Sequence, residues 1–283
     1  MLLPWIIGMV VFVVGPLLAT LALSFTRYTI LQPPEFIGID NYRRMFGSEP
    51  FWDSWRVTLL YAAAGTLFSL IASLGIALAI FHVRIAKGFW RTAFYFPVLL
   101  AGTAEALVMG IVWSGDYGLV NGFLGLLGVS GPPWLQSADW ALPAFVLMRY
   151  WSIGTIMLLL LGARYNVPEE LYEAARIDGA RGWQLFRRIT FPLMSPVFLF
   201  VTILGVISSL QAFTQIFILT RGGPQRSTEV IGLHLYFEAF ENLQMGYAST
   251  VSWSVFLVTM AFVLVLFATS RWWVYYESGD EGW

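Results

Sequence analysis

Residues 57–81 read VTLLYAAAGTLFSLIASLGIALAIF, a run of apolar and small residues without a charged side chain. A helix of about 20 such residues crosses the hydrocarbon core of a bilayer. On either side of this stretch, similar runs occupy residues 2–25, 90–114, 140–163, 193–220 and 247–272. The sequence therefore predicts an all-α integral membrane protein with six transmembrane helices, forming a single domain over residues 1–283.

The composition of the 283-residue chain agrees with this prediction, since 58% of its residues are hydrophobic and only 12% are charged. Soluble domains carry about 25% charged residues, so an ordinary water-soluble fold is excluded. The net charge is −1 and no basic cluster occurs, which argues against nucleic acid as a partner. The chain has no cysteine, so disulfides and cysteine-ligated metals are excluded as well.

The first run, residues 2–25, has the alternative interpretation of a cleaved signal peptide. It lacks a positive leading segment and exceeds the 7–15 apolar residues of such a peptide, so we expect a retained span. Lys and Arg are more frequent in the C-terminal tail and in the links after the second and fourth spans than in the other links. This asymmetry predicts that both termini and the link at residues 164–192 lie in the cytoplasm.

Sequence motifs for catalysis are missing from the chain. Its two histidines, His82 and His234, cannot form an H-E-x-x-H metal motif, and neither a G-x-x-x-x-G-K-[ST] loop nor a G-x-S-x-G elbow occurs. We therefore expect no catalytic residue, no metal site and no ATP site of this kind. An integral membrane enzyme is the least favoured alternative, with Glu105 the only buried carboxylate suited to such a role.

The link at residues 164–192 differs in composition from the apolar runs beside it. Pro168 is favoured in the first turn of a helix, and Glu169 complements the positive end of the helix dipole. Asp178 and Gly179 form a natural helix end, because glycine readily adopts the left-handed conformation. We expect a short amphipathic helix here, resting on the bilayer and its own spans or contacting another protein, and a second short helix at residues 183–189.

The sequence EAA at residues 173–175, with Gly179, Ile189 and Pro192, resembles the E-A-A-x3-G-x9-I-x-L-P signature of binding-protein-dependent ABC importer permeases. Phe191 replaces the leucine of that pattern. Further matches at VPEELY (167–172), IDGA (177–180), Gln211, Phe213, GGP (222–224) and GYAS (246–249) extend the resemblance to nearly the whole chain. They resemble the carbohydrate subgroup, which includes the maltose and glycerol-phosphate permeases.

The resemblance implies the type I ABC importer permease fold in a prokaryotic inner membrane, with a coupling helix in the cytoplasmic loop. Two ATPase subunits would bind ATP and Mg²⁺, and this chain would bind no cofactor. A second permease subunit would complete the path, and an extracytoplasmic solute-binding protein would dock on the links at residues 27–56 and 221–246. The implied ATPase-coupling residues are Leu171, Glu173, Ala174, Ala175, Asp178 and Gly179.

The substrate class implied by the resemblance is a disaccharide or oligosaccharide. A phosphorylated polyol such as glycerol phosphate is the alternative, and Arg149 would favour it by offering a fixed cation. A membrane scaffold that retains the fold without transport is a third hypothesis. Replacement of Glu173 separates transport from the scaffold role, because only transport requires coupling to ATP hydrolysis.

Glu105 and Arg149 are ionisable residues well inside predicted spans, where charges are costly and therefore mark sites. At 1.5 Å per residue, both lie about 13 Å below the outer boundary, and Gln211 reaches the same depth. Two interpretations are open: an ion pair that locks the third and fourth spans together, which we favour, or groups that line the substrate path. Trp151, Phe213 and Trp253 are further path candidates, because aromatic faces stack on sugar rings.

Overall fold

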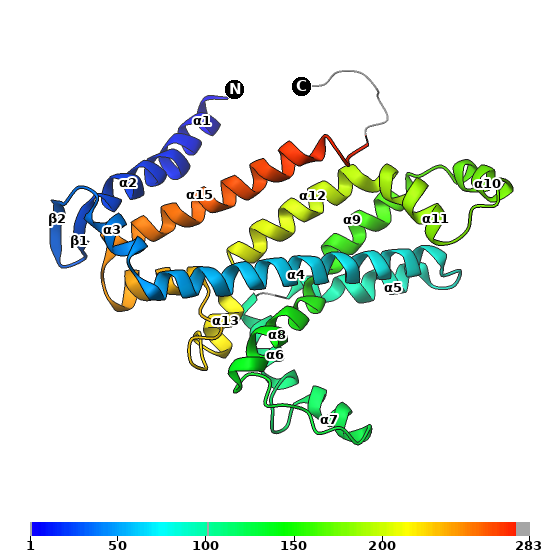
Figure 1. Cartoon of the computed structure of the whole chain (residues 1–283), viewed down its shortest axis with the longest axis horizontal. Helices are drawn as coiled ribbons and strands as arrows, with labels where there is room; N and C mark the ends of the chain where they lie inside the picture. The colour runs from blue at the N-terminus through cyan, green and yellow to red at the C-terminus, as the bar shows by residue number, and fades with distance from the viewer. Residues whose placement is uncertain (1, 101, 276–283) are drawn as a thin grey trace.

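The computed structural model describes residues 2–100 and 102–275 and shows long helices side by side, with a small hairpin at one end (Figure 1). The N-terminal half contains α1 (Leu3–Met9), α2 (Gly15–Ser24), β1 (Thr26–Thr29), β2 (Gln32–Phe36), α3 (Asp40–Phe46), α4 (Glu49–His82), α5 (Lys87–Tyr95), α6 (Gly102–Val112) and α7 (Leu119–Leu126). The C-terminal half contains α8 (Ala138–Met148), α9 (Gly154–Tyr165), α10 (Glu169–Ile177), α11 (Trp183–Leu185), α12 (Phe191–Leu210), α13 (Thr214–Leu219), α14 (Ile231–Tyr236) and α15 (Met245–Ser270). Short 3₁₀ turns at Phe96–Leu99 and Arg149–Ser152 and π-helical turns at Val10–Val14, Phe186–Thr190 and Phe237–Glu241 connect several of these helices.

Four helical stretches of the described chain are long and apolar enough to cross a membrane: Leu3–Ser24, Glu49–His82, Trp183–Leu219 and Met245–Ser270. The third and fourth predicted spans are instead bent pairs. Lys87–Leu99 meets Gly102–Val112 at 104°, and Ala138–Ser152 meets Gly154–Tyr165 at 53°. The described residues therefore hold four to six candidate spans, which agrees with a helical membrane protein, but two of the spans are broken helices.

Small and hydroxylated side chains allow α4 to pack closely against α9 and α12. Thr66, Ser69, Ser73 and Ala77 recur every three or four residues and are buried, so they form one face of α4. On α12, a Cβ added to Gly205 would stand 3.0 Å from the Thr66 side chain. Small residues at such positions let two backbones approach, which is the usual way in which membrane helices associate.

The β1–β2 hairpin departs from the predicted all-α fold. Thr26 pairs with Phe36 in antiparallel register. Asn41 fixes the hairpin to the end of α2, because its amide nitrogen donates to the carbonyl oxygens of Ser24 at 2.9 Å and Thr26 at 2.8 Å. Gly246, at the start of α15, lies so close to the Thr26 carbonyl that a Cβ would collide with it. The hairpin is thus part of the packed end of the molecule.

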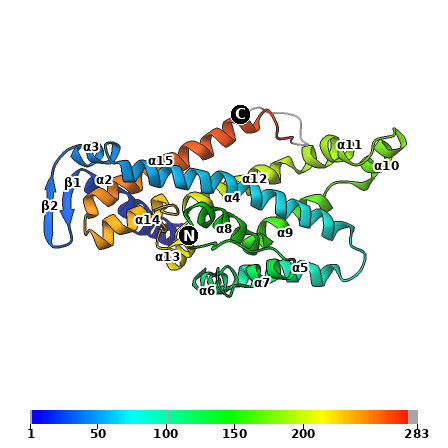
Figure 2. The same ribbon diagram turned by 60° about the horizontal axis from the view of Figure 1, so that its bottom comes forward.

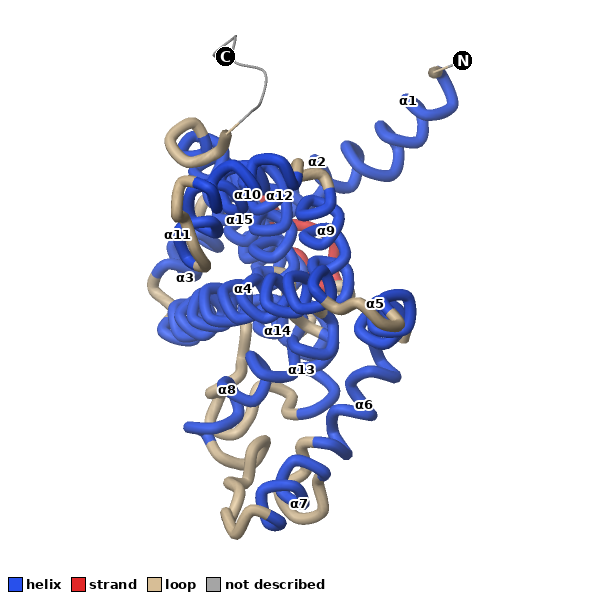
Figure 3. Tube along the Cα trace, turned by 90° about the vertical axis from the view of Figure 1, so that its right-hand side faces the viewer, coloured by secondary structure: helices blue, strands red, loops and turns tan. Residues whose placement is uncertain are grey.

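Two regions singled out by the sequence lie at opposite ends of the long axis. The loop with α10 and α11 is at one end, and the hairpin with α3 is at the other, in two views that agree (Figures 1 and 2). Between them, α6 and α7 project away from the side that carries α1 (Figure 3). This separation suits a chain whose predicted cytoplasmic and external links face opposite sides of a membrane.

Candidate translocation cavity and coupling loop

Three interruptions of helical structure meet at one cavity of about 230 Å³. The interruptions are the turn before α6, the 3₁₀ turn Arg149–Ser152 between α8 and α9, and residues 211–213 between α12 and α13. The lining includes Gly102, Ser152 and Phe213 from these three places. Irregular backbone within a membrane domain is tolerated where it borders a polar cavity, and transporters place substrate sites at such broken helices.

Glu105, in the first turn of α6, lines this cavity and ties three elements together. Its Oε1 accepts a hydrogen bond from the Ser152 hydroxyl at 2.7 Å and another from the Gln215 amide nitrogen at 2.8 Å. Ser152 belongs to the 3₁₀ turn and Gln215 to α13. Hydrogen bonds to a carboxylate are among the stronger neutral–ion contacts, so Glu105 fixes α6 against both elements.

Arg149 reaches the same cavity from the opposite wall. Its Nε donates to the Ser69 hydroxyl at 3.1 Å, and its Nη1 lies 3.5 Å from the Tyr61 hydroxyl. The guanidinium also lies over the Tyr61 ring, 5.7 Å from the centroid. Gly65 makes room for the side chain, because a Cβ there would stand 2.7 Å from the Arg149 Cδ.

The predicted ion pair between Glu105 and Arg149 is wrong, because no contact within 4.0 Å joins them among the ion pairs of the described residues. Two hydroxyl groups bind Arg149 instead, and one hydroxyl and one amide bind Glu105. Both charged side chains line the same cavity. Gln211, predicted at the same depth, lines a separate groove against α15. Gln215, four residues later in the sequence, supplies the amide that contacts Glu105.

The three aromatic candidates lie in different places. Phe213 lines the cavity and stacks on Phe217 with ring centroids 5.2 Å apart. Trp151 packs against the buried cluster around Phe145 and Met148. Trp253 meets the edge of Phe256 on α15 and is not part of the cavity wall. Of these three candidates, Phe213 alone therefore lines the cavity.

Sequence reasoning missed the cavity residues Tyr61, Ser69, Ser152 and Gln215. The signal for the first two was present in the 57–81 run itself. Tyr61, Gly65, Ser69 and Ser73 recur every four residues and so share a polar face of one apolar helix. A membrane helix with a polar face directs that face toward the protein interior or a cavity.

The coupling loop begins with α10, which ends as the sequence predicts. The Ala180 N–H donates to the Ala175 carbonyl at 2.9 Å and the Gly179 N–H to the Arg176 carbonyl at 3.0 Å. Gly179 has a φ of +83°, the left-handed conformation of a Schellman cap. The chain therefore turns back sharply after one short helix.

A single buried side chain and a stacked arginine attach α10 to the long helices. Tyr172 is buried, and its hydroxyl lies 2.8 Å from the Thr190 Oγ1 at the start of α12. The Arg164 guanidinium lies between two rings, 3.9 Å from the Phe81 centroid and 4.2 Å from the Tyr172 centroid. It also donates to the Glu169 carboxylate at 3.2 Å. Arg164 thereby joins α4, α9 and α10.

The opposite face of α10 is uncovered in this chain. Leu171 is 44% exposed and Ile177 is 87% exposed. The predicted coupling residues Glu173, Ala174, Asp178 and Gly179 are exposed too, and Ala175 is half-buried. Ile177 was not among the predicted coupling residues, and it is the more exposed of these two apolar side chains of α10.

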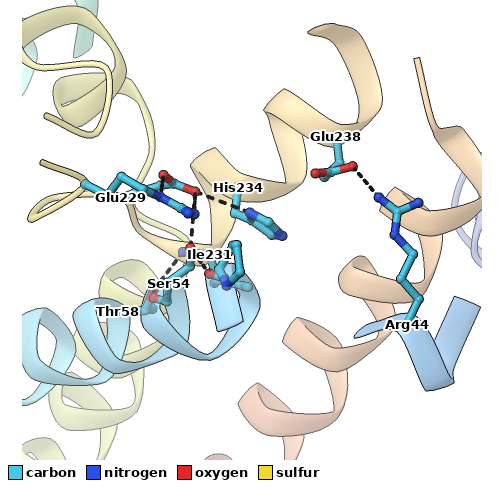
Figure 4. Close-up of polar contacts among 9 residues, drawn as sticks. Arg44, Ser54, Thr58, Glu229, Ile231, His234 and Glu238 are labelled. Carbon is cyan, nitrogen blue, oxygen red and sulfur yellow. Dashed lines mark hydrogen bonds and ion pairs between the residues drawn. The ribbon is translucent and has the colours of Figure 1, made fainter. Parts of the chain in front are cut away.

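At the other end of the molecule, the loop before α14 encloses a buried carboxylate (Figure 4). Glu229 accepts two hydrogen bonds from Arg226 at 2.6 and 2.7 Å, and it lies 3.2 Å from the His234 Nδ1. Burial alone would raise the pKa of Glu229, but hydrogen bonds from His234 and Arg226 and the arginine charge outweigh it and lower the pKa to about 2. The Ile231 N–H donates to the Thr58 hydroxyl at 2.7 Å, which fixes this loop to α4.

The family model for the binding-protein-dependent transport system inner membrane component matches residues 1–277. The chain belongs to this family. It is therefore a permease subunit of an ABC importer, a non-catalytic and multi-pass protein of the bacterial inner membrane, in a family that typically binds no cofactor and works with a solute-binding protein.

Relatives in the permease family span almost the full chain. The probable ABC transporter permease protein YesP of Bacillus subtilis is 36% identical, over 98% of this chain and 91% of its own. The trehalose/maltose transport system permease protein MalF of Thermococcus litoralis is 32% identical, over 96% and 92%. The lactose transport system permease protein LacF of Rhizobium radiobacter is 29% identical, over 92% and 89%.

A solved structure supports the fold of this permease. A chain of a bacterial alginate ABC transporter, crystallised with its alginate pentasaccharide-bound periplasmic protein, superimposes with a TM-score of 0.82 at 26% identity. The match covers 95% of this chain and 92% of that one. The importer permease fold predicted from the sequence is thus confirmed.

Proposed function

We propose that this permease subunit forms half of the path of an ATP-driven importer for disaccharides or oligosaccharides, as a single domain over residues 1–283. Relatives named for trehalose and maltose, for lactose and for alginate support a saccharide as the substrate class. The cavity adds a physical reason, because hydroxyl, amide and charged groups line it together with the aromatic side chain of Phe213. Sugars are bound by this combination of hydrogen-bonding groups and an apolar ring face.

The observation that carries the transport mechanism is the attachment of α10. Its inner face is fixed to α4 and α12 through Arg164, Tyr172 and Thr190, whereas its outer face is exposed. A partner that grips the outer face would move α4 and α12 together with α10, since a packed interior transmits displacement rather than absorbing it. In this proposal, closure of the ATPase pair on ATP rocks the helices around the cavity.

The orientation and the partners follow from the same proposal. Both termini and α10 face the cytoplasm, where two ATPase subunits hold ATP and Mg²⁺. A second permease subunit covers the open side of the cavity, because a charged cavity exposed to lipid would be unfavourable. The solute-binding protein docks at the opposite end, on the links at residues 27–56 and 221–246, which include the hairpin and the Glu229 loop.

Single cysteines test the position of α10 directly, because the natural chain has none. Ile177→Cys replaces a side chain that is 87% exposed on α10, and Leu126→Cys replaces one that is 85% exposed on α7. In inside-out vesicles stripped of the ATPase, we expect a membrane-impermeant maleimide to label Ile177→Cys. Return of the ATPase that co-purifies with the permease should protect that cysteine, whereas Leu126→Cys, in an external link, should be labelled only in right-side-out vesicles.

Labelling of Ile177→Cys that is indifferent to the ATPase, or that occurs only in right-side-out vesicles, would contradict the proposal. The scaffold alternative is tested with Glu173→Ala, matched to Asp116→Ala, which removes an exposed carboxylate between α6 and α7. Transport requires sugar uptake driven by ATP to collapse with Glu173→Ala alone. A scaffold would keep its function with either substitution.

A further inference from the structure

Arg149 and Arg164 are both placed among the helices, yet only one has a counter-ion. The buried Arg164 guanidinium donates to the Glu169 carboxylate at 3.2 Å. Arg149 contacts only the neutral hydroxyls of Ser69 and Tyr61, and no carboxylate of the described chain lies within 4.0 Å of it. The cavity therefore contains a fixed positive charge that the described residues leave without an ionic partner.

The surroundings of Arg149 hold this charge at the cavity. Ser69 binds one edge of the guanidinium, Tyr61 lies beneath it, and Gly65 leaves space for its aliphatic part. A glycine inside a helix is less favourable than an alanine, so the space for Arg149 is obtained at the expense of the stability of α4. An uncompensated guanidinium in a membrane domain is costly as well, which makes a ligand with negative charge the simplest compensation.

Glu105 shares the cavity but does not neutralise Arg149. Its Oε1 already accepts hydrogen bonds from Ser152 and Gln215, and Oε2 has no side-chain partner within the described part of the chain. Oε2 is thus open to a hydroxyl donor. Beside these two groups, Phe213 adds an aromatic side chain to the cavity wall. The cavity combines a cation, a hydrogen-bond acceptor and an aromatic surface.

We infer that this cavity binds an acidic saccharide, whose carboxylate pairs with Arg149 while a ring hydroxyl donates to Glu105. This inference rests on the proposed function and specifies its substrate class. A phosphate monoester fits less well, because its charge of about −2 at neutral pH exceeds that of the single guanidinium. A planar carboxylate matches both the charge and the fork of one arginine.

The first experiment identifies the cargo with defined probes. The solute-binding protein of the importer is incubated with an equimolar mixture of maltose, lactose, cellobiose, digalacturonate, cellobiouronate and glycerol 3-phosphate, and the retained compound is identified by mass spectrometry. We expect an acidic disaccharide, and its methyl ester should bind at least about tenfold more weakly. Retention of a neutral sugar, of glycerol 3-phosphate or of none of them overturns the inference.

The second experiment assigns the recognition to Arg149. The complete importer is reconstituted in liposomes, and the uptake of the retained acidic sugar is compared with that of its methyl ester. Arg149→Gln should lower the ratio of acid to ester uptake about tenfold, and Arg149→Lys should keep it within about threefold of the natural importer. Because both sugars are measured on the same preparation, the ratio is independent of how much variant folds. An unchanged ratio in Arg149→Gln overturns the role of Arg149.

The two proposals fail in different ways. ATP-driven uptake of a neutral sugar leaves the importer function standing and removes only the acidic cargo. A complete complex that takes up no saccharide in the presence of ATP removes the proposed function itself.

Discussion

The residue that shapes the cavity most directly has no side chain. Gly65 lies on α4 beside Arg149, and its Cβ would stand 2.7 Å from the arginine Cδ and 3.2 Å from Nε. On the same helix, Gly75 has no heavy atom within 4 Å of an added Cβ. The two glycines therefore provide a matched pair, in which the same methyl group is added with and without a steric effect on the cavity.

Gly65→Ala should displace the Arg149 side chain from Ser69 and reduce sugar uptake at least about tenfold, by the loss of one charge-assisted contact. Gly75→Ala should leave uptake unchanged, and it should raise the thermal midpoint slightly because alanine favours the helix. Uptake by proteoliposomes and thermal unfolding in detergent check both expectations. Equal uptake by the two variants would show that the position of Arg149 is irrelevant to transport.

Glu229 makes the loop before α14 sensitive to acid. Its pKa falls from an ordinary 4.5 to about 2 in the folded chain, so the carboxylate stabilises the fold above pH 4.5 and loses this effect as the pH falls toward 2. The difference corresponds to about 3 kcal/mol. Glu229→Gln should therefore lower the thermal midpoint at pH 7 and reduce its dependence on pH between about 5 and 3.

Glu241 supplies the control, since its ion pair with Arg221 is exposed on both sides. Such pairs contribute about 0–1 kcal/mol, so Glu241→Gln should keep the thermal midpoint and the pH profile of the natural chain. A Glu229→Gln variant with an unaltered profile would mean that the buried cluster does not govern the acid sensitivity.

At the scale of elements, α10 is held by few contacts and is therefore easily uncoupled. Its own sequence supplies the cap at Gly179, but its position depends on the Arg164 guanidinium between the Phe81 and Tyr172 rings. A cation over an aromatic face contributes about 2 kcal/mol when desolvated, and here two rings share one cation. The number of ATP molecules hydrolysed per sugar transported should therefore depend on this contact rather than on the stability of α10 itself.

Arg164→Ala should lower the thermal midpoint by an amount that corresponds to about 2 kcal/mol, because the desolvated cation between the two rings is lost. In the assembled importer, it should raise the number of ATP molecules hydrolysed per sugar transported. Arg176→Ala removes a more exposed partner of the Glu169 carboxylate and should alter stability by less than about 1 kcal/mol. If Arg164→Ala leaves the number of ATP molecules hydrolysed per sugar unchanged, this contact has no role in coupling ATP hydrolysis to transport.

At the scale of the whole molecule, the first span contacts the rest of the chain mainly through its α2 end, which packs beside α15. None of the most apolar window of Leu3–Ser24 is buried, against 50% for Trp183–Leu219. Such a helix requires lipid or a neighbouring subunit around it. The apolar surface of this span is therefore shielded from water only by lipid or by a neighbouring subunit.

A nitroxide at Phe12→Cys, where the side chain is 79% exposed, should report this environment. We expect frequent collisions with oxygen and few with a water-soluble nickel chelate, as in hydrocarbon. The same label at Ile177→Cys should show the reverse in the absence of the ATPase. Free access of the nickel chelate to residue 12 would contradict a membrane position for the first span, Leu3–Ser24.

The helical membrane fold could be predicted because each apolar run has the length of about 20 residues that a helix needs to cross the bilayer. The two bends could not, because they depend on tertiary contacts. At Gly154, for example, an added Cβ would stand 2.5 Å from the Phe94 carbonyl oxygen. The hairpin was missed for a similar reason, since Thr26 and Phe36 become strand residues by pairing with each other and packing beside α15.

The cavity was partly predictable. Glu105 and Arg149 were found because a charge in an apolar run is conspicuous, whereas their partners Ser69 and Ser152 resemble ordinary membrane residues. Counting residues from a span boundary predicted that Gln211 would lie near Glu105, but the helix is interrupted at residues 211–213, and Gln215 contacts Glu105 instead. The direction in which a side chain points around a broken helix cannot be read from residue spacing.

The hairpin also determines how another protein can bind at its end of the molecule. Strand β2 reads QPPEF and all five of its residues are exposed, so one edge faces outward. Pro33 and Pro34 have no N–H to donate, and a strand added along that edge would find part of its hydrogen-bonding pattern missing. A docking protein must therefore recognise side chains instead of extending the sheet, and neighbouring importers in a crowded membrane are protected from joining edge to edge.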